Sequence, residues 1–183
     1  MSAFIVSVGG PSSSGKTTFC YNLSKKFAEF KVKVISLDNY RTENIGKAVS
    51  PTSGVEYTDW SNPEYIDIDK VMACIRDESE KADLIFVEGL CSLYFHDIRE
   101  VSNLRIYLDA SAESRIFRRI MRNTRRDGSS VKSVGEYHLD SARFSEKKYV
   151  ENTKVFSDLV LDGEFITDRG MSVIYLYIHN AIM

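Results

Sequence analysis

Residues 9–18 hold a complete phosphate-binding loop (P-loop), which constrains the fold of this chain more than any other sequence feature. Within this segment the pattern is Gly10-x-x-x-x-Gly15-Lys16-Thr17. The two glycines permit backbone conformations that a Cβ would forbid, so successive N–H groups can turn toward one anion. Lys16 supplies a point charge for the outer phosphates, and the Thr17 hydroxyl can bind Mg²⁺. We expect a nucleoside triphosphate to contact the whole loop: Gly10, Pro11, Ser12, Ser13, Ser14, Gly15, Lys16, Thr17 and Thr18.

The segments on either side of the loop fit this motif. The apolar run Phe4–Val8 is typical of a buried strand, and Thr18–Phe30 carries apolar residues at helical spacing. A loop between a strand and a helix directs the positive end of the helix at bound phosphates. We therefore interpret the motif as a nucleotide site rather than as a glycine- and serine-rich turn.

Length and composition narrow the class of protein further. The 183 residues fit one domain with a sizeable core, so we expect a single domain over residues 1–183. The net charge of −2 leaves no general basic surface, and we do not expect a nucleic acid partner. The three cysteines are scattered along the chain and form no Cys-x-x-Cys pair, which suits reduced thiols. The late apolar segment 171–183 is too short to span a bilayer, and the short apolar N-terminus is a strand rather than a signal peptide. We expect a cytoplasmic protein with no membrane association.

Apolar runs alternate with helical patterns along the chain. Helices are predicted to start near Asp67, whose carboxylate can cap the first turn, and near Ser111. The expected strands cover 4–8, 32–36, 84–87, 104–108 and 159–161. This alternation predicts βαβ units, and hence a three-layer α/β/α fold around a central parallel sheet of about five strands. The segment 38–63 is rich in turn residues and is predicted to be a loop, whereas the C-terminal segment fits either a helix or a strand.

Asp38 is a candidate catalytic base. It lies just past the second expected strand, and ligands of parallel sheets collect outside the carboxyl ends of the strands. A carboxylate there can orient an acceptor hydroxyl and take its proton during phosphoryl transfer. The alternative is a helix cap or a turn residue, because Asp-Asn pairs are common in turns.

Glu88 ends a wholly apolar strand and is a candidate ligand of Mg²⁺. A charge at such a position is costly unless it meets a cation, and Mg²⁺, bound directly or through water, is a natural one. The alternative is an ion pair with a neighbouring arginine. Together with the Thr17 hydroxyl, Glu88 would form the metal site.

Arginines crowd the helix predicted over about 111–126. Five of them follow spacings of three or four residues and so share one face: Arg115, Arg118, Arg119, Arg122 and Arg126. Such like charges repel, so we expect something anionic to offset them. On a lid over about 115–135, arginines would stabilise the transferring phosphoryl group and exclude water. A solvated basic face or a nucleic-acid patch is the alternative.

The chain resembles the uridine kinase and phosphoribulokinase family of P-loop kinases. The stretches that carry the resemblance are 9–18, 36–40, 62–67, 87–90 and 104–163. The resemblance implies that Lys16 and Thr17 bind ATP and Mg²⁺, that Asp38 is the catalytic base, and that Glu88 lies near the metal. It also implies that Arg119 and Arg122 belong to a lid helix that contacts substrate and nucleotide phosphates. Family members often form oligomers, so a homo-oligomer is implied as well.

The departures from the family pattern fall where the acceptor should bind. Uridine kinases insert a β-hairpin before the Glu-Gly strand, and Val71–Asp83 is too short to contain it. Ser61 stands where the family has its ribose-binding Asp, although Asp59 is close. Glu136 stands where the family has a Gln, and the lid turn reads Asp-Gly-Ser at 127–129 instead of Arg-Gly-Arg. The candidate acceptor contacts are Asp38, Tyr40, Asp59, Tyr65, Arg119, Glu136 and Tyr137.

The sequence thus predicts a kinase that moves the γ-phosphoryl group of Mg-ATP to a hydroxyl of a small metabolite, with Asp38, Lys16, Arg119 and Arg122 as catalytic residues. The arginine excess points to an anionic acceptor. One alternative is a divergent uridine or cytidine kinase, in which Trp60, Tyr57 and Tyr65 of the 50–65 loop stack on the base. An alternative from another class is a non-catalytic module that senses nucleotides or binds nucleic acid.

Overall fold

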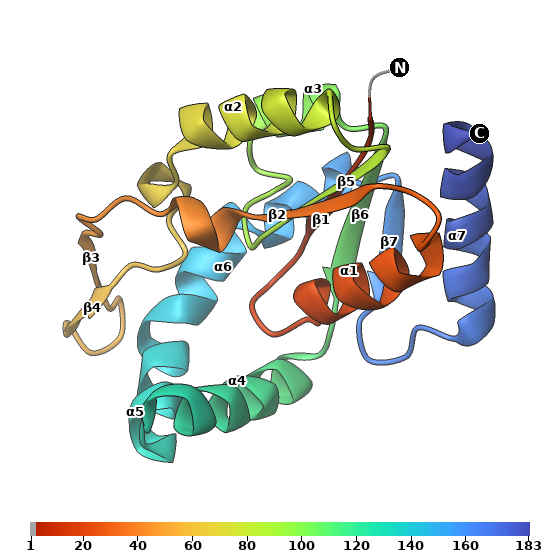
Figure 1. Ribbon diagram of the computed structural model, residues 1–183. Coiled ribbons are helices and arrows are strands. Elements are labelled where there is room, and N and C mark those ends of the chain that lie inside the picture. Colours follow the sequence, from red (N-terminus) through yellow and green to blue (C-terminus); the bar gives the residue numbers. More distant parts are fainter. Residues whose placement is uncertain (1–2) are drawn as a thin grey trace.

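The computed structural model describes residues 3–183, and its helices and strands alternate along the chain (Figure 1). Seven strands are present in this range: β1 (Phe4–Gly9), β2 (Val32–Ser36), β3 (Lys47–Val49), β4 (Glu56–Thr58), β5 (Leu84–Glu88), β6 (Leu104–Asp109) and β7 (Leu159–Asp162). Seven α-helices accompany them: α1 (Lys16–Ser24), α2 (Ile68–Ser79), α3 (His96–Val101), α4 (Ala112–Asp127), α5 (Val131–Tyr137), α6 (Arg143–Tyr149) and α7 (Asp168–Ile182).

Five of the strands form one parallel sheet in the order β2-β5-β1-β6-β7. β1 lies at the centre, where Val6 pairs with Phe86 on one side and Leu104 on the other. All five predicted strands are present within a residue or two of their expected bounds. The predicted three-layer architecture with a parallel sheet of five strands is therefore confirmed.

Two hydrophobic layers cover the faces of this sheet. Alternate residues of the strands point to opposite faces, so Val6 and Phe86 belong to one core cluster while Ile5 and Ile85 belong to the other. Helices α1 and α7 pack on the first face, and α2 and α3 pack on the second (Figure 1). Burial of both faces explains why the central strands read as continuous apolar runs.

Three segments differ from the sequence-based expectation. The predicted loop 38–63 contains a short antiparallel hairpin, in which Ala48 of β3 pairs with Tyr57 of β4. Helix α1 starts two residues earlier than predicted, at Lys16, and its α-helical part ends at Ser24. The C-terminal segment, for which helix and strand were both open, is the helix α7. Between α2 and β5 there are four residues, so the segment 71–83 contains no hairpin.

The topology gathers several chemically important segments at one edge of the sheet. The P-loop follows β1, Asp38 follows β2, and Glu88 ends β5, so all three lie at the carboxyl ends of parallel strands. Helices α4, α5 and α6 extend beyond this edge, beside the β3–β4 hairpin (Figure 1). Within residues 3–183, no helix is long and apolar enough to cross a membrane.

Candidate active site

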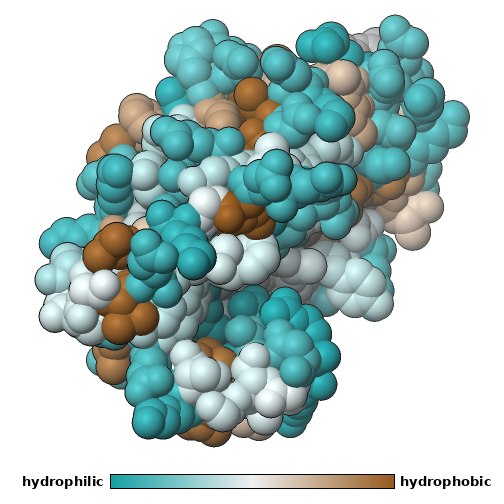
Figure 2. Space-filling view, turned by 90° about the vertical axis from the view of Figure 1, so that its left-hand side faces the viewer, coloured by the Kyte–Doolittle hydropathy of each residue, from teal (hydrophilic) through white to brown (hydrophobic). Residues whose placement is uncertain are grey.

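A cavity of about 1410 Å³ lies at the carboxyl edge of the sheet. The P-loop and the start of α1 line one part of it, and arginines of α4 line another. Seen from the side of the β3–β4 hairpin, the surface is hollowed above its lowest lobe, and the side chains around this hollow are mainly hydrophilic (Figure 2). The volume is large enough to hold two small molecules at once, because single ligand pockets occupy roughly 300–1,000 Å³.

The backbone of the P-loop is shaped to hold an anion. Gly10 has φ 135°, and a Cβ there would overlap the backbone carbonyl oxygen of Leu108, so no other residue fits. Ser13 also adopts a positive φ, of 64°. The hydroxyls of Ser13 and Ser14 are buried without a hydrogen-bond partner among the residues that the structure describes, which is costly unless a ligand supplies one. These orphaned groups fit a phosphate, as the sequence motif predicts.

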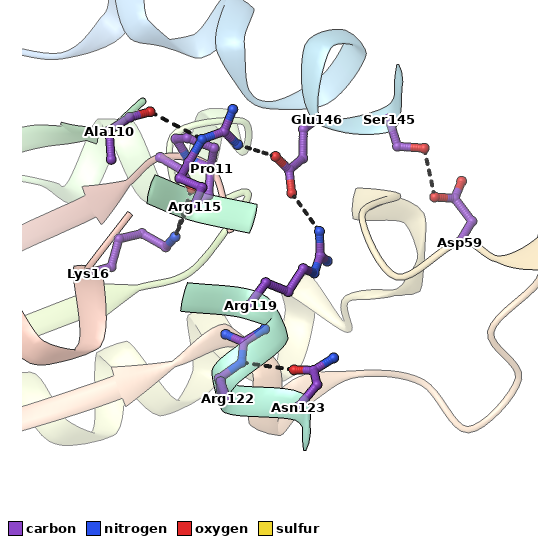
Figure 3. Close-up of polar contacts among 11 residues, drawn as sticks. Pro11, Lys16, Asp59, Ala110, Arg115, Arg119, Arg122, Asn123, Ser145 and Glu146 are labelled. Carbon is purple, nitrogen blue, oxygen red and sulfur yellow. Dashed lines mark hydrogen bonds and ion pairs between the residues drawn. The ribbon is translucent and has the colours of Figure 1, made fainter. Parts of the chain in front are cut away.

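Lys16 is buried at the start of α1 and points back into the loop. Its Nζ donates to the carbonyl oxygens of Gly10, at 2.8 Å, and Pro11, at 2.7 Å (Figure 3). Burial lowers the pKa of Lys16, and the nearby carboxylate of Glu88 opposes that shift. An anion bound in the loop would stabilise the charged ammonium, because it would replace part of the lost hydration.

Thr17 and Glu88 bring two oxygen ligands together. The Thr17 hydroxyl donates to Glu88 Oε1 at 3.3 Å, and Glu88 is buried at the end of β5. No arginine or lysine forms an ion pair with Glu88 in the part of the chain that the structure describes. Hydroxyl and carboxylate oxygens suit Mg²⁺, which usually keeps several waters and substrate phosphates as its other ligands. Residues 3–183 hold no cluster of three or more His, Cys, Asp or Glu side chains that would bind a metal alone.

Asp38 lines the same cavity from a 3₁₀ turn that directly follows β2. Its side chain is 68% exposed and accepts a bond from Arg41 Nη2 at 2.8 Å. Asp38 is also close enough to Lys16 to oppose the lowering of the lysine pKa. A carboxylate that is exposed to the cavity and close to Lys16 can contact an acceptor hydroxyl.

Helix α4 presents its arginine face to the cavity. Arg118, Arg119, Arg122 and Arg126 line it, whereas Arg115 is tied to Glu146 of α6. Arg118 Nη1 donates to the carbonyl oxygens of Ser13 and Gly163, so this arginine clamps the P-loop. Burial, followed by the charges of Arg119 and Arg126, lowers the pKa of Arg122. The expected common face is therefore present.

The predicted acceptor contacts divide into two groups. Tyr137 lines the cavity, and the Arg119 guanidinium lies 5.1 Å from the centre of its ring. Tyr40 instead packs against the core cluster beneath α2, and the Tyr65 ring lies against Gly46. Asp59 is buried and accepts a bond from the Ser145 hydroxyl, and Glu136 is exposed and pairs with Lys132. Tyr40, Asp59, Tyr65 and Glu136 are not among the residues that line the cavity, and their role as acceptor contacts stays a prediction.

The sequence did not lead us to assign three residues to the acceptor site or the lid: Arg41, Trp60 and Glu146. Arg41 follows a turn that already contained the candidate base, and nothing in its spacing marked it. Trp60 was considered only as a stacking residue of the nucleoside alternative, although it lines the cavity. Glu146 lies in the polar stretch Arg-Phe-Ser-Glu-Lys-Lys, which is typical of a solvated helix, yet its side chain is 1% exposed. Only long-range packing reveals it.

Comparison with known proteins gives a consistent picture. A model of the phosphoribulokinase / uridine kinase family matches residues 58–164. A uridine kinase of Chlamydia pneumoniae is 25% identical over 207 residues, which cover 100% of this chain and 91% of that protein. Two solved structures share the fold: a possible uridine kinase from Bacillus stearothermophilus (18% identity, TM-score 0.54, 88% of this chain and 90% of that chain) and a shikimate kinase from Bacteroides thetaiotaomicron (13% identity, TM-score 0.53, 98% of each).

Proposed function

The chain belongs to the phosphoribulokinase / uridine kinase family, whose members are small-molecule kinases, and on this premise we propose that it transfers the γ-phosphoryl group of ATP to a hydroxyl of a small metabolite. One observation carries the proposal. A single cavity contains the phosphate lysine Lys16, the Thr17–Glu88 oxygen pair and the open carboxylate of Asp38. These are the parts that in-line phosphoryl transfer requires.

Each residue has a defined task in this reaction. Asp38 accepts the proton of the acceptor hydroxyl as the new oxygen–phosphorus bond forms and the bond to the bridging oxygen of ATP breaks. Lys16 and Arg119 stabilise the negative charge on the phosphoryl oxygens. Thr17 and Glu88 would hold Mg²⁺, which neutralises charge on the β- and γ-phosphates.

The charge of the cavity wall favours an anionic acceptor. Arg41, Arg119 and Arg122 line the cavity, and Arg41 already neutralises Asp38 through their ion pair. An arginine beside the catalytic carboxylate can bind a carboxylate or phosphate group of the acceptor and bring its hydroxyl close to Asp38. A sugar phosphate or a hydroxy acid has this combination of groups.

A nucleoside is the second candidate acceptor. Trp60 is 46% exposed and lines the cavity together with Tyr137, so a base could stack on either ring. The presence of the Trp60 and Tyr137 rings in the cavity wall is the specific observation that favours a nucleoside. Uridine and cytidine are the acceptors to test for it.

The deciding experiment measures ADP release from Mg-ATP with a panel of acceptors. The panel holds nucleosides, hydroxy acids, sugar phosphates and phosphorylated alcohols, and each is tested with the wild type and with Asp38→Asn. We expect turnover of one acceptor, lowered about 10²- to 10⁴-fold in the variant while ATP binding is kept. Asp69→Asn, an exposed aspartate on α2, is the matched control and should retain full activity.

Each other result has a clear meaning. Turnover of nucleosides alone would refute an anionic acceptor and support a nucleoside kinase. ATP binding without turnover of any acceptor would favour a nucleotide-sensing module. Unchanged turnover in Asp38→Asn would refute the role of this carboxylate.

A further inference from the structure

Glu146 holds two arginines of α4 from the neighbouring helix α6. Its side chain is 1% exposed, and its two carboxylate oxygens accept bonds from different arginines: Oε2 from Arg115 Nη1 and Oε1 from Arg119 Nη1, the latter at 3.4 Å (Figure 3). Arg115 also donates from Nε to the carbonyl oxygen of Ala110. Arg115 is therefore fixed within the protein, whereas Arg119 keeps donors free for the cavity that it lines.

The charges around Glu146 leave a positive group directed at the cavity. Two guanidinium groups face one carboxylate, so the cluster carries an excess of one positive charge. His138 lies against the same arginines, and burial together with Arg119, Arg115 and Arg143 lowers its pKa to about 4. Because His138 is neutral near pH 7, it adds no further charge. Because Arg115 has a further partner in Ala110, Arg119 is the arginine of this pair that can present positive charge to the cavity.

The residue before Glu146 contacts the segment that carries Trp60. The Ser145 hydroxyl donates to Asp59 Oδ1 at 3.0 Å in a buried position (Figure 3). Asp59 directly precedes Trp60 and Ser61, which both line the cavity. Two adjacent residues of α6 thus contact different parts of the molecule. Ser145 contacts segment 59–61, and Glu146 contacts Arg115 and Arg119 of α4.

A second contact ties the same helical run to the β3–β4 hairpin. Asp140 lies in a π-helical turn, His138–Ala142, directly before α6. Its carboxylate accepts bonds from Thr52 at 3.0 Å, Ser53 at 2.8 Å and Tyr57 at 3.2 Å. The run 138–149 therefore contacts segment 50–60 at two places and contacts α4 through Glu146. A movement of α4 can be transmitted to Trp60 through these contacts.

We propose that Glu146 is a positioning residue that directs Arg119 at the phosphoryl group, and that the Ser145–Asp59 bond couples this position to segment 59–61. This rests on the proposed phosphotransfer function only for the identity of the group that Arg119 meets. The coupling makes the two ends of the cavity respond to each other: nucleotide phosphates that bind Arg119 move α6, and α6 moves the segment that carries Trp60.

Trp60 is the only tryptophan of the chain, so its fluorescence reports this segment without a label. The probe is the non-hydrolysable β,γ-imido analogue of ATP with Mg²⁺, and calorimetry gives its affinity in parallel. We expect the analogue to shift the emission of the wild type, and we expect Ser145→Ala to bind it equally well while losing most of that shift. The matched control is Ser141→Ala, since Ser141 is buried on the same helical run but its hydroxyl forms no hydrogen bond within residues 3–183. This control should respond as the wild type does.

Glu146→Gln tests the positioning role itself. It keeps the shape of the side chain and removes the charge that holds Arg119, so the preference for ATP analogue over ADP should fall roughly tenfold, the value of one charge-assisted hydrogen bond to phosphate. An unchanged preference in Glu146→Gln, or a full emission shift in Ser145→Ala, would overturn the proposal. If Glu146→Gln does not fold, the comparison of Ser145→Ala with Ser141→Ala decides alone.

These outcomes are separable from those of the proposed function. An acceptor panel without turnover would refute the kinase while the Trp60 response still decides the coupling. Turnover of an acceptor by a Ser145→Ala enzyme with a full emission shift would support the kinase and refute the coupling.

Discussion

Gly163 shows how closely the P-loop is packed at the scale of a single residue. It follows β7, and its N–H donates to the carbonyl oxygen of Asp109 at 2.6 Å. A Cβ at this position would overlap the carbonyl oxygen of Ser14 and lie 3.0 Å from that of Asp109. The P-loop is thus packed against a residue about 150 positions away in the sequence, and only a glycine fits there.

Gly163→Ala should therefore damage the site and the fold together. We expect weaker ATP binding and a free energy of unfolding lower by roughly 1–3 kcal/mol, because the backbone of the P-loop must move to relieve the overlap. Calorimetry with ATP and urea unfolding measure the two effects. The control is Gly135→Ala in α5, where a Cβ meets no atom within 4 Å. This control should gain up to about 1 kcal/mol and keep its affinity. Equal ATP affinities and equal free energies of unfolding for Gly163→Ala and Gly135→Ala would contradict the close packing of the P-loop against Gly163.

The residues of the site were predictable to different degrees for physical reasons. The P-loop, Asp38 and Glu88 could be predicted because each is a local pattern: a motif or a polar residue at the end of an apolar strand. Glu146 could not be predicted, since its burial arises from the packing of α6 against α4. Tyr40, a predicted acceptor contact, is not among the residues that line the cavity. It follows Asp38 by two positions in a 3₁₀ turn, and the turn directs it at the core instead of the cavity.

At the scale of elements, α7 was the segment that the sequence pattern left open. Its stretch 173–178 reads as a continuous apolar run, which fits a buried strand as well as a helix. In the structure only one stripe of the helix is buried, formed by Met171, Ile174 and Ile178. These residues pack on the face of the sheet that α1 also covers. Tertiary packing, which the sequence pattern does not show, therefore determines that this segment is a helix and not a strand.

Substitutions on α7 should separate its two faces. Ile178 is fully buried in the core cluster, and Leu176 is exposed two residues earlier. We expect Ile178→Ala to lower the free energy of unfolding by roughly 2–5 kcal/mol through lost burial and a cavity. Leu176→Ala should change it by less than about 0.5 kcal/mol, as surface substitutions usually do. Urea unfolding checks both values, and a similar cost for the two variants would mean that α7 does not pack on the sheet through this stripe.

At the scale of the whole molecule, two parts of the chain line the same cavity. The parallel sheet with its covering helices supplies the P-loop, Asp38 and Glu88, and the run α4–α6 supplies the arginines. Within the second part lie the buried Arg115–Glu146–Arg119 cluster, which joins α4 to α6, and His138, whose Nδ1 has no hydrogen-bond partner among residues 3–183. Buried charges are stable only while they are matched, so this region should be where the protein responds most to a change in pH.

His138 gives that response a definite sign. Burial, and after it the charges of Arg119, Arg115 and Arg143, lowers its pKa from 6.5 to about 4. Between these two values the unfolded chain binds a proton that the folded protein does not. Acidification from pH 6.5 to about 4 therefore removes stability, by up to about 1.4 kcal/mol for each pH unit, and above pH 6.5 the contribution of His138 is constant.

Replacing His138 with Gln, which does not titrate, should remove this part of the pH dependence. We expect the wild type to lose stability relative to His138→Gln as the pH falls from about 7.5 to about 5, whatever the absolute cost of the substitution. Urea unfolding followed by circular dichroism at several pH values gives the two curves. Parallel curves for the wild type and His138→Gln would show that His138 takes up a proton as readily in the folded protein as in the unfolded chain, and that the arginine cluster does not keep it neutral.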